Sequence, residues 1–319
     1  MRYISRLVLP RLGLSLGTLL AVSLMIFWAV ELLPGDTATR VLGREATPER
    51  VQDLREQLNL DRSAPERYGI WLAGFVQGDW GESLVSKRPV TDVVLPRLEN
   101  TLLLAGLTLV IYVPLSLILG IGLALLRESR IAPFLSAVVV AGTALPEFVV
   151  GLLLLLVFAV WLPWFPPLAL VDDAETLPQL LQTLTLPAVT LAVAITAYAV
   201  LMMQASLVSV LESDYVRMAT LKGLSRRRVV LRHALPNALG PALRVTVLNI
   251  AFIIGGIVTV EVVFNFPGLG RLFIDSIRIL DTPVIEAIAL ILAGIYVLLN
   301  LGADVATGAL NPRLRAAAR

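Results

Sequence analysis

Side chains able to do chemistry are scarce in this chain of 319 residues. It has no cysteine and a single histidine, His233, so disulfides, thiolate metal sites and cysteine nucleophiles are excluded and histidine-based catalysis has almost no material. It also lacks the G-x-x-x-x-G-K-[ST] loop that holds the phosphates of ATP. We therefore expect a chain that is not an enzyme, with no catalytic residue and no metal or cofactor of its own.

Some polar side chains stand inside long apolar runs, where an ionisable group is costly. Placing Asp, Lys or Arg at the centre of a membrane helix costs about 2.5–3.5 kcal/mol on insertion scales, so such residues need partners or water. Glu147 follows Pro146 near the middle of one run, and Asn249 and Glu261 lie in another. These side chains either line a path for a solute or make local interhelical bonds. We take all three as candidates for a translocation path.

A polar segment, residues 211–240, separates two apolar runs and has the layout of two short helices. Ser213 or Asp214 can cap the first helix, in which a tyrosine, a methionine and an alanine share one face, and Gly223 is placed to end it at positive φ. Ser225 can cap a second helix, which begins with three arginines and reaches a Leu-Pro pair. An ordinary basic loop is the alternative, but it does not require this helix–glycine–helix layout.

The composition indicates that these residues belong to a membrane protein. Hydrophobic residues make up 57% of the chain and charged residues 16%, with a mean hydropathy of +0.83. Soluble domains carry about 45–50% apolar and about 25% charged residues, so this chain has too little polar surface for a water-soluble fold. Disordered tails, secreted mini-domains and ordinary cytosolic enzymes are excluded, and an all-α bundle in a lipid bilayer is predicted.

Six apolar runs are long enough to cross a bilayer, which takes roughly 20 residues. The first is longer than the roughly 7–15 residues of a signal-peptide core, and no small-x-small cleavage site follows it, so we expect a retained anchor helix. In the fifth run, Gly255-Gly256 would permit close helix approach. The predicted spans are 12–30, 101–126, 131–162, 186–210, 241–262 and 284–306.

Basic residues predict the orientation, because short cytoplasmic loops near span ends are enriched in Lys and Arg. With the N-terminus inside, the short outer loops 163–185 and 263–283 hold only Arg271 and Arg278. The outer segment 31–100 carries more bases, but long loops translocate largely regardless of charge. Both termini are therefore predicted to be cytoplasmic. The inner segments hold Arg2, Arg6, Arg11, Arg127, Arg130, Arg217, Lys222, Arg226, Arg227, Arg228, Arg232, Arg313, Arg315 and Arg319.

The outer segment also has helical patterns of its own. Thr47-Pro48-Glu49 is typical of a helix start. A second helix opens at Pro65, and its Tyr68, Trp71 and Phe75 belong to an i, i+3, i+4, i+7 pattern. The predicted regions are an anchor helix at 1–30, an outer helical region at 31–100, a core at 101–306 that includes the segment 211–240, and a cytoplasmic tail at 307–319.

The segment after the fourth run resembles a motif of the permease subunits of binding-protein-dependent ABC importers. Their cytoplasmic loop carries E-A-A, three residues, G, nine residues and I-x-L-P. Ala219, Gly223 and Leu235-Pro236 match at this spacing, while Arg217 stands where the Glu would be. The peptide/nickel branch shows the form D-Y-x-R-x-A-x-x-K-G-L-S, and residues 214–225 fit it throughout.

Three further motifs resemble the same branch. Leu33-Pro34-Gly35-Asp36 is similar to its LPGD, residues 266–271 resemble its F-x-x-P-G-L-G-R loop, and residues 311–315 resemble its N-P-R-x-R tail. The similarity runs from about Arg2 to Arg315, with the motifs in order and on the expected membrane sides. The chain is thus similar to the first permease subunit of this branch, the DppB/OppB type.

The resemblance implies a type I ABC importer permease fold of six transmembrane helices in a bacterial inner membrane, as half of a heterodimeric core. It implies a second permease subunit, two ATP-binding subunits that bind ATP and Mg and hydrolyse ATP in trans, and an extracytoplasmic substrate-binding protein. It also implies a coupling helix, whose bases can pair with ATPase carboxylates or with lipid headgroups. The implied ATPase-coupling residues are Asp214, Tyr215, Arg217, Met218, Ala219, Lys222 and Gly223.

Other functional classes agree less well with the residues. A serine-type intramembrane protease needs a histidine within the membrane, but His233 lies in the basic segment, and an aspartyl type needs two membrane aspartates where only Asp304 is near. A stand-alone channel or secondary carrier leaves the helix–glycine–helix layout unexplained. For the importer, we expect peptides or a related small solute, with nickel chelates, glutathione, oligosaccharides and opines as alternatives.

Overall fold

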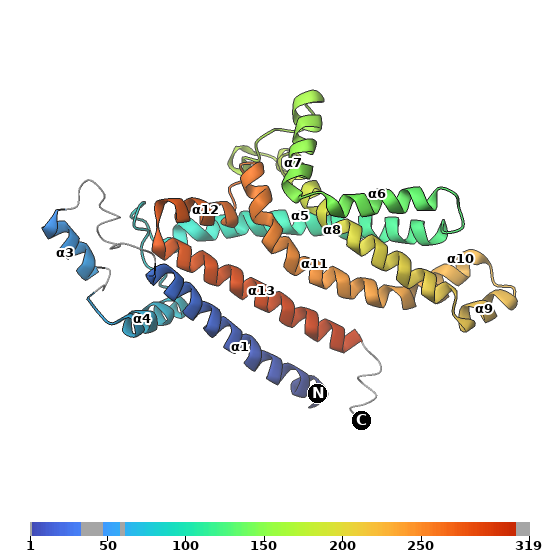
Figure 1. Ribbon diagram of the computed structural model, residues 1–319, viewed down its shortest axis with the longest axis horizontal. Coiled ribbons are helices and arrows are strands. Elements are labelled where there is room, and N and C mark those ends of the chain that lie inside the picture. The colour runs from blue at the N-terminus through green and yellow to red at the C-terminus, as the bar shows by residue number, and fades with distance from the viewer. Residues whose placement is uncertain (1, 33–46, 58–60, 311–319) are drawn as a thin grey trace. The chain divides into compact units, whose positions relative to one another are not determined.

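The computed structural model describes residues 2–32, 47–57 and 61–310, most of which are helical (Figure 1). The sequence motifs at 33–36 and 311–315 lie outside the described residues. The helices are α1 (Arg2–Glu31), α3 (Pro48–Gln57), α4 (Ala64–Gln77), α5 (Val90–Leu125), α6 (Ala132–Ala144), α7 (Glu147–Leu155), α8 (Leu177–Leu211), α9 (Asp214–Leu221), α10 (Arg226–Arg228), α11 (Leu235–Val263), α12 (Leu269–Ile279) and α13 (Thr282–Leu310), with short π-helical segments η2 (Leu156–Trp161) and η4 (Val229–Ala234) and a 3-10 turn η3 (Val171–Asp173).

The predicted membrane spans fall on these helices. Within the described residues, four stretches are long and apolar enough to cross a bilayer, and a fifth is formed if α6 and α7, bent by 103°, make one broken span. The remaining predicted span, 241–262, lies within α11, which has 29 residues. The all-α membrane fold predicted from composition is confirmed. The four continuous stretches are Pro10–Glu31, Val90–Leu125, Leu177–Leu211 and Thr282–Gly302.

Two of these helices begin earlier than the apolar runs predict. The second span was expected from residue 101, but α5 begins at Val90. The fourth was expected from residue 186, but α8 begins at Leu177, after a capping box in which the Gln179 side chain accepts from the backbone N–H of Thr176 at 3.1 Å. An apolar run measures the part of a helix in lipid, and polar residues and caps extend the helix beyond it.

The chain divides into two compact units, of which the first contains Thr101–Pro267. Its central helix is α8, which packs against α6, α7 and α11. In the most apolar 18-residue stretch of α8, 67% of the residues are buried. Close approach to α5 depends on Gly120, because a Cβ there would lie 2.6 Å from the Cβ of Met203. The core of this unit includes the fully buried side chains of Tyr112, Leu191, Ile257, Phe264 and Phe266.

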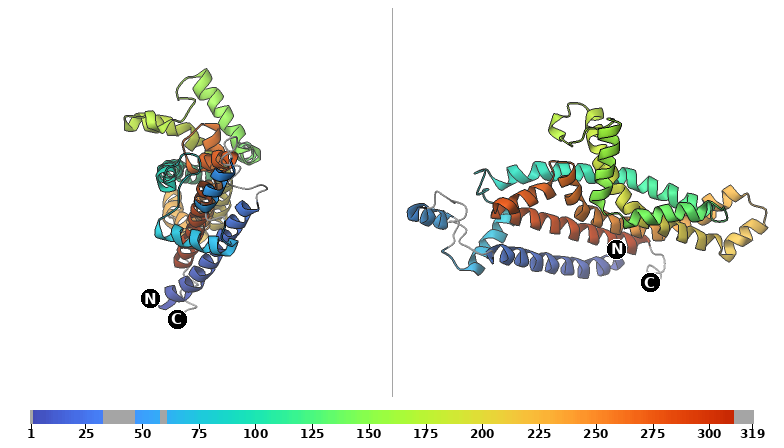
Figure 2. Two further views of the ribbon diagram at one scale, coloured as in Figure 1. Left: turned by 90° about the vertical axis from the view of Figure 1, so that its left-hand side faces the viewer. Right: turned by 45° about the horizontal axis from the view of Figure 1, so that its top comes forward.

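The third predicted span is broken rather than continuous. Helix α6 ends at Ala144, Leu145 and Pro146 are extended, and α7 restarts at Glu147. Figures 1 and 2 show α7 turned sharply out of the line of α6. Proline has no N–H to donate and disfavours helix in the residue before it, so the Leu-Pro pair explains the break.

The second unit contains Val8–Asn100 and Gly268–Leu298. Helix α4 crosses the C-terminal end of α1 (Figure 2), where the hydroxyls of Tyr68 and Ser23 are hydrogen-bonded at 2.8 Å and the rings of Tyr68 and Phe27 are 5.5 Å apart. Arg67 of α4 forms an ion pair with Glu31 of α1. The aromatic face predicted for α4 therefore packs against the anchor helix.

The second unit also contains helix α12, which the sequence patterns did not predict. Leu269 is buried, and Leu272 and Phe273 pack on the same cluster, which is the i, i+3, i+4 pattern of an amphipathic helix. The next residue after the α12 cap, Asp281, is buried and accepts hydrogen bonds from the Ser83 hydroxyl at 2.5 Å and the Leu84 N–H at 3.0 Å. This carboxylate fixes the loop before α5 to the start of α13.

Candidate functional site

The short helix α9 begins at the predicted place but is not capped by a side chain. Ser213 stands at the N-cap with extended backbone. Its hydroxyl instead donates to the Val210 carbonyl at 2.5 Å, so the predicted Ser213 side-chain cap is wrong. Asp214 occupies the first turn, where a negative charge is favoured by the helix dipole.

The C-terminal end of α9 is fixed by Gly223, as the sequence predicts. Its φ is +80°, in the left-handed region that favours glycine. Its N–H donates to the Thr220 carbonyl at 3.0 Å, and the next N–H, of Leu224, donates to the Ala219 carbonyl at 3.3 Å. These two bonds form a Schellman motif, which sets the direction in which the chain leaves α9.

The two faces of α9 differ sharply in exposure. Val216 and Ala219 are only 3% and 8% exposed, whereas Tyr215, Met218 and Leu221 are 48%, 56% and 82% exposed. The prediction that Ala219 shares a contact face with Tyr215 and Met218 is therefore wrong, because Ala219 packs inward. The residue that completes the exposed apolar face is Leu221, which the sequence analysis did not single out.

The inward face anchors α9 to the helices on either side. Val216 and Ala219 belong to a buried cluster with Leu207 of α8 and with Val229 and Ala234 of η4. The Tyr215 hydroxyl adds a hydrogen bond to the His233 carbonyl at 3.3 Å. A helix held on one face presents the other face in a fixed orientation.

The second predicted short helix is not a separate element. Helix α10 continues through η4 into α11, so the helical path runs from Arg226 to Val263 without the stop expected at Leu235-Pro236. A proline inside a regular α-helix loses a hydrogen bond and clashes with the carbonyl four residues earlier. The π-helical turn η4, which ends two residues before Pro236, changes the bonding pattern there, and such turns are frequent at functional sites.

Basic side chains surround α9 without forming one cluster. Arg217 and Lys222 are exposed. Arg226 donates to the Leu125 carbonyl at 3.4 Å, and Arg127 pairs with Glu212 at 2.7 Å. Between them is a hollow of about 360 Å³, lined by residues at the end of α5 and on α9, α10 and η4. These contacts tie the C-terminal end of α5 to the start of α9.

Among the three candidate path residues, Glu147, Asn249 and Glu261, the last is fully buried and paired. The Thr101 hydroxyl donates to Glu261 Oε1 at 2.6 Å. The backbone carbonyl of Glu261 accepts the N–H of Phe266 at 2.8 Å, at the end of α11. The carboxylate thus joins α5 to α11.

Asn249 is likewise engaged between helices. Its Nδ2 donates to the Tyr112 hydroxyl at 2.8 Å and to the Ile195 carbonyl at 3.2 Å. This one side chain of α11 therefore bonds both α5 and α8.

Glu147 has a different environment, at the break between α6 and α7. Its side chain is half-buried and lies against the backbone of Gly256 in α11. A Cβ added to Gly256 would be 2.6 Å from Glu147 Oε2 and 2.9 Å from Oε1, whereas one added to Gly255 would meet nothing within 4 Å. Of the glycine pair, only Gly256 is therefore closely approached, and the group that approaches it is the carboxylate of Glu147.

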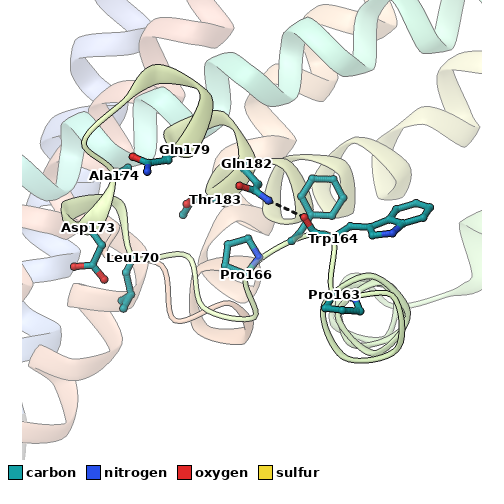
Figure 3. A pocket seen from close by; sticks show the side chains of 10 residues that line it. Pro163, Trp164, Pro166, Leu170, Asp173, Ala174, Gln179, Gln182 and Thr183 are labelled. Carbon is teal, nitrogen blue, oxygen red and sulfur yellow. Dashed lines mark hydrogen bonds between the residues drawn. The ribbon is translucent and has the colours of Figure 1, made fainter.

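A further hollow of about 380 Å³ lies between the end of η2 and the start of α8 (Figure 3). The Gln182 side chain donates to the Trp164 carbonyl at 2.8 Å across the hollow. The side-chain carbonyl of Gln179 accepts the backbone N–H of Thr176 in the N-terminal cap of α8. The side-chain amides that line the hollow thus hold together the loop between η2 and α8. No motif in the sequence indicates this hollow.

These features define a class of protein. Long apolar helices, a broken span with a carboxylate at the break, and a short helix with an exposed apolar face fit a membrane transport subunit. Comparison with known families agrees: residues 116–316 match the model for the binding-protein-dependent transport system inner membrane component, and residues 4–105 match the model for the N-terminal part of such components.

The chain belongs to this family, and it is an ABC importer permease of the peptide/nickel-type branch rather than an enzyme. It is similar to the glutathione transport system permease protein GsiC of Escherichia coli (strain K12), with 38% identity over 308 residues, 97% of this chain and 98% of that protein. GsiC of Pectobacterium atrosepticum is 38% identical over 304 residues, 95% of this chain and 96% of that protein. The resemblance stated from motifs is confirmed, and the protein is a multi-pass inner-membrane component.

Proposed function

We propose that this chain forms one half of a heterodimeric permease core with a second, homologous permease. Two ATP-binding subunits, which bind ATP and Mg, supply the energy, and an extracytoplasmic binding protein delivers the solute. Family membership supports partners of these kinds. The distribution of Lys and Arg supports an orientation with both termini in the cytoplasm, which places α9 on the side where ATP is available.

Helix α9 is proposed to couple ATP hydrolysis to transport. The observation that carries this proposal is its division into a buried face, Val216 and Ala219, and an exposed apolar face, Tyr215, Met218 and Leu221. Exposed apolar side chains on a cytoplasmic helix are suited to a cleft in a protein partner. The buried face and the Gly223 motif make the helix stiff enough to transmit a rigid-body displacement. Asp214, Arg217 and Lys222 flank this face and are proposed to set its charge contacts with the ATPase.

Short peptides are the proposed substrates, with the tripeptide glutathione as the first to test. The relatives named above are permeases of glutathione transport systems, which supports a peptide-like solute over a nickel chelate, an oligosaccharide or an opine.

The test is uptake into proteoliposomes that contain the permease with its genomic neighbours: the second permease, the ATPases and the binding protein. We expect uptake of labelled glutathione or of short peptides to require both ATP and the binding protein. A nickel chelate and an oligosaccharide serve as matched controls. ATP-dependent uptake of a control, with none of peptides, would contradict the substrate class; uptake without ATP would contradict the importer mechanism.

The three candidate path residues, Glu147, Asn249 and Glu261, are proposed to contribute to the translocation path in different ways. Asn249 and Glu261 hold together the helices that form its wall, since both are bonded across helices. Glu147 is proposed to face the solute. In this cysteine-free chain, a Glu147→Cys variant of the assembled complex should react with a water-soluble thiol reagent, whereas Ile257→Cys, at a fully buried position, should not. Complete protection of the first variant in every nucleotide state would exclude Glu147 from the path.

A further inference from the structure

Of Glu147, Asn249 and Glu261, Glu147 is the one whose side chain has no hydrogen-bond or ion-pair partner among the described residues. Glu261 accepts from Thr101, and Asn249 bonds Tyr112 and Ile195. Among the described residues, no hydrogen bond or ion pair to the carboxylate of Glu147 is found. An ionisable group at membrane depth needs a partner or water, so this carboxylate is available to a ligand that the isolated chain does not supply.

The helix break makes the same place polar in a second way. Helix α6 stops at Ala144 and α7 starts at Glu147, with extended backbone between them. The last carbonyls of a helix have no partner within it and carry partial negative charge. In membrane transporters, interrupted helices of this kind place polar backbone at solute sites, and carbonyls at such helix ends favour cations.

The carboxylate of Glu147 lies against its neighbour on α11. Its oxygens lie so close to Gly256 that a Cβ there would stand 2.6 Å from Oε2, which leaves the side chain little freedom on that side. The rest of the half-buried side chain is open in this chain.

The ligand that suits this place is an organic ammonium group. A single carboxylate matches one –NH3+ in charge and can accept two of its three N–H bonds. A bare divalent cation takes six or more oxygen ligands, and no group of three or more His, Cys, Asp or Glu side chains able to hold a metal is found among the described residues. Peptides carry such an ammonium group at their N-terminus.

We propose that Glu147 binds the protonated amino group of the transported solute and makes the permease select solutes that carry one. This proposal rests on the proposed import of peptide-like solutes. The alternative is that Glu147 only stabilises the start of its own helix, α7, through the helix dipole; in that case its loss would affect all solutes equally.

The test compares two solutes, a short peptide and its N-acetylated form, both of which the binding protein binds measurably. Uptake is measured with the complete complex in proteoliposomes, for the unaltered permease and for Glu147→Gln, Glu147→Asp and Glu128→Gln. Glu128, exposed in a loop outside the spans, is the matched control for loss of one carboxylate. Because the binding protein is the same in every arm, a change in the ratio of the two uptake rates belongs to the permease.

We expect Glu147→Gln to lower kcat/KM for the free-amine peptide roughly tenfold or more, as for loss of a charged hydrogen bond, with little change for the acetylated peptide. Glu147→Asp should keep part of the preference, and Glu128→Gln should keep all of it. Equal loss for both peptides, or no change for either, would overturn this assignment while leaving peptide import intact. Failure of the unaltered complex to import either peptide would overturn the proposed function itself, and this assignment with it.

Discussion

At the scale of single residues, Gly223 shows how one backbone conformation can decide coupling. A Cβ at this position would meet nothing within 4 Å, but the φ of +80° is one that L-residues rarely adopt. The cost of a side chain there is therefore conformational, about 1–2 kcal/mol, and greater for a β-branched residue. Relief of this strain would re-aim α9 relative to Ser225.

We predict that Gly223→Val inserts normally but uncouples the transporter, with Gly223→Ala less affected. Membrane level, co-purification of the ATPase and solute-stimulated ATP hydrolysis are the measurements. Gly240→Ala in α11 is the control, since its Cβ would also meet nothing within 4 Å and no positive φ is involved. A Gly223→Val permease that couples hydrolysis to uptake at the normal ratio would remove α9 from the mechanism.

The sequence predicted these residue types better than their partners. That Gly223 adopts positive φ followed from its place after a short amphipathic helix, and the structure confirms it. The bonds of Asn249 to Tyr112 and of Glu261 to Thr101 join residues more than a hundred positions apart, and no local pattern encodes such pairs. Likewise, Ala219 was placed on the wrong side because helical spacing gives neighbours on a helix but not which side is covered.

At the scale of elements, the approach of Glu147 to α11 depends on Gly256. Adding a methyl group at Gly256 would place it 2.6 Å from a carboxylate oxygen, whereas the same change at Gly255 would enter open space. Overpacking typically costs about 1–3 kcal/mol, and we expect a cost at the lower end of this range because the clashing atoms are the flexible end of the Glu147 side chain.

We therefore predict that Gly256→Ala lowers the thermal stability of the purified complex and slows uptake, while Gly255→Ala changes neither appreciably. Because the clash is with the side chain of Glu147, adding Glu147→Ala should restore most of the stability lost in Gly256→Ala. Equal melting temperatures for the two glycine variants would contradict the close approach of α7 to Gly256.

Hydrophobic runs predicted where helices cross the bilayer but not where they begin or break. Helices α5 and α8 both begin before their apolar runs, in more polar segments that hydropathy does not identify as helical. The π-helical turns η2 and η4 each end two residues before a proline, and their bonding pattern has no signature in hydropathy. Helix α12 was missed although its i, i+3, i+4 pattern was readable, because the segment was treated as a short outer loop.

At the scale of the whole molecule, the orientation in the membrane determines which surface can meet which partner. If the distribution of arginines sets the topology, a reporter active only in the cytoplasm should work when inserted at Ser129 and fail at Ser63. Enzyme activity of such fusions, normalised to protein level, is the measurement. Comparable activity at the two sites would contradict the orientation, and with it the cytoplasmic position of α9.

The central claim is that the exposed face of α9 contacts the ATP-binding subunit, and cross-linking tests it most directly. Because the chain has no cysteine, a photoreactive thiol reagent can be attached at Met218→Cys alone, or at Val85→Cys, an exposed control on the predicted outer side. On illumination of the assembled, transport-active complex, we predict a cross-link to the ATP-binding subunit from position 218 and none from position 85. Absence of that cross-link from position 218 in an intact, active complex would contradict the account.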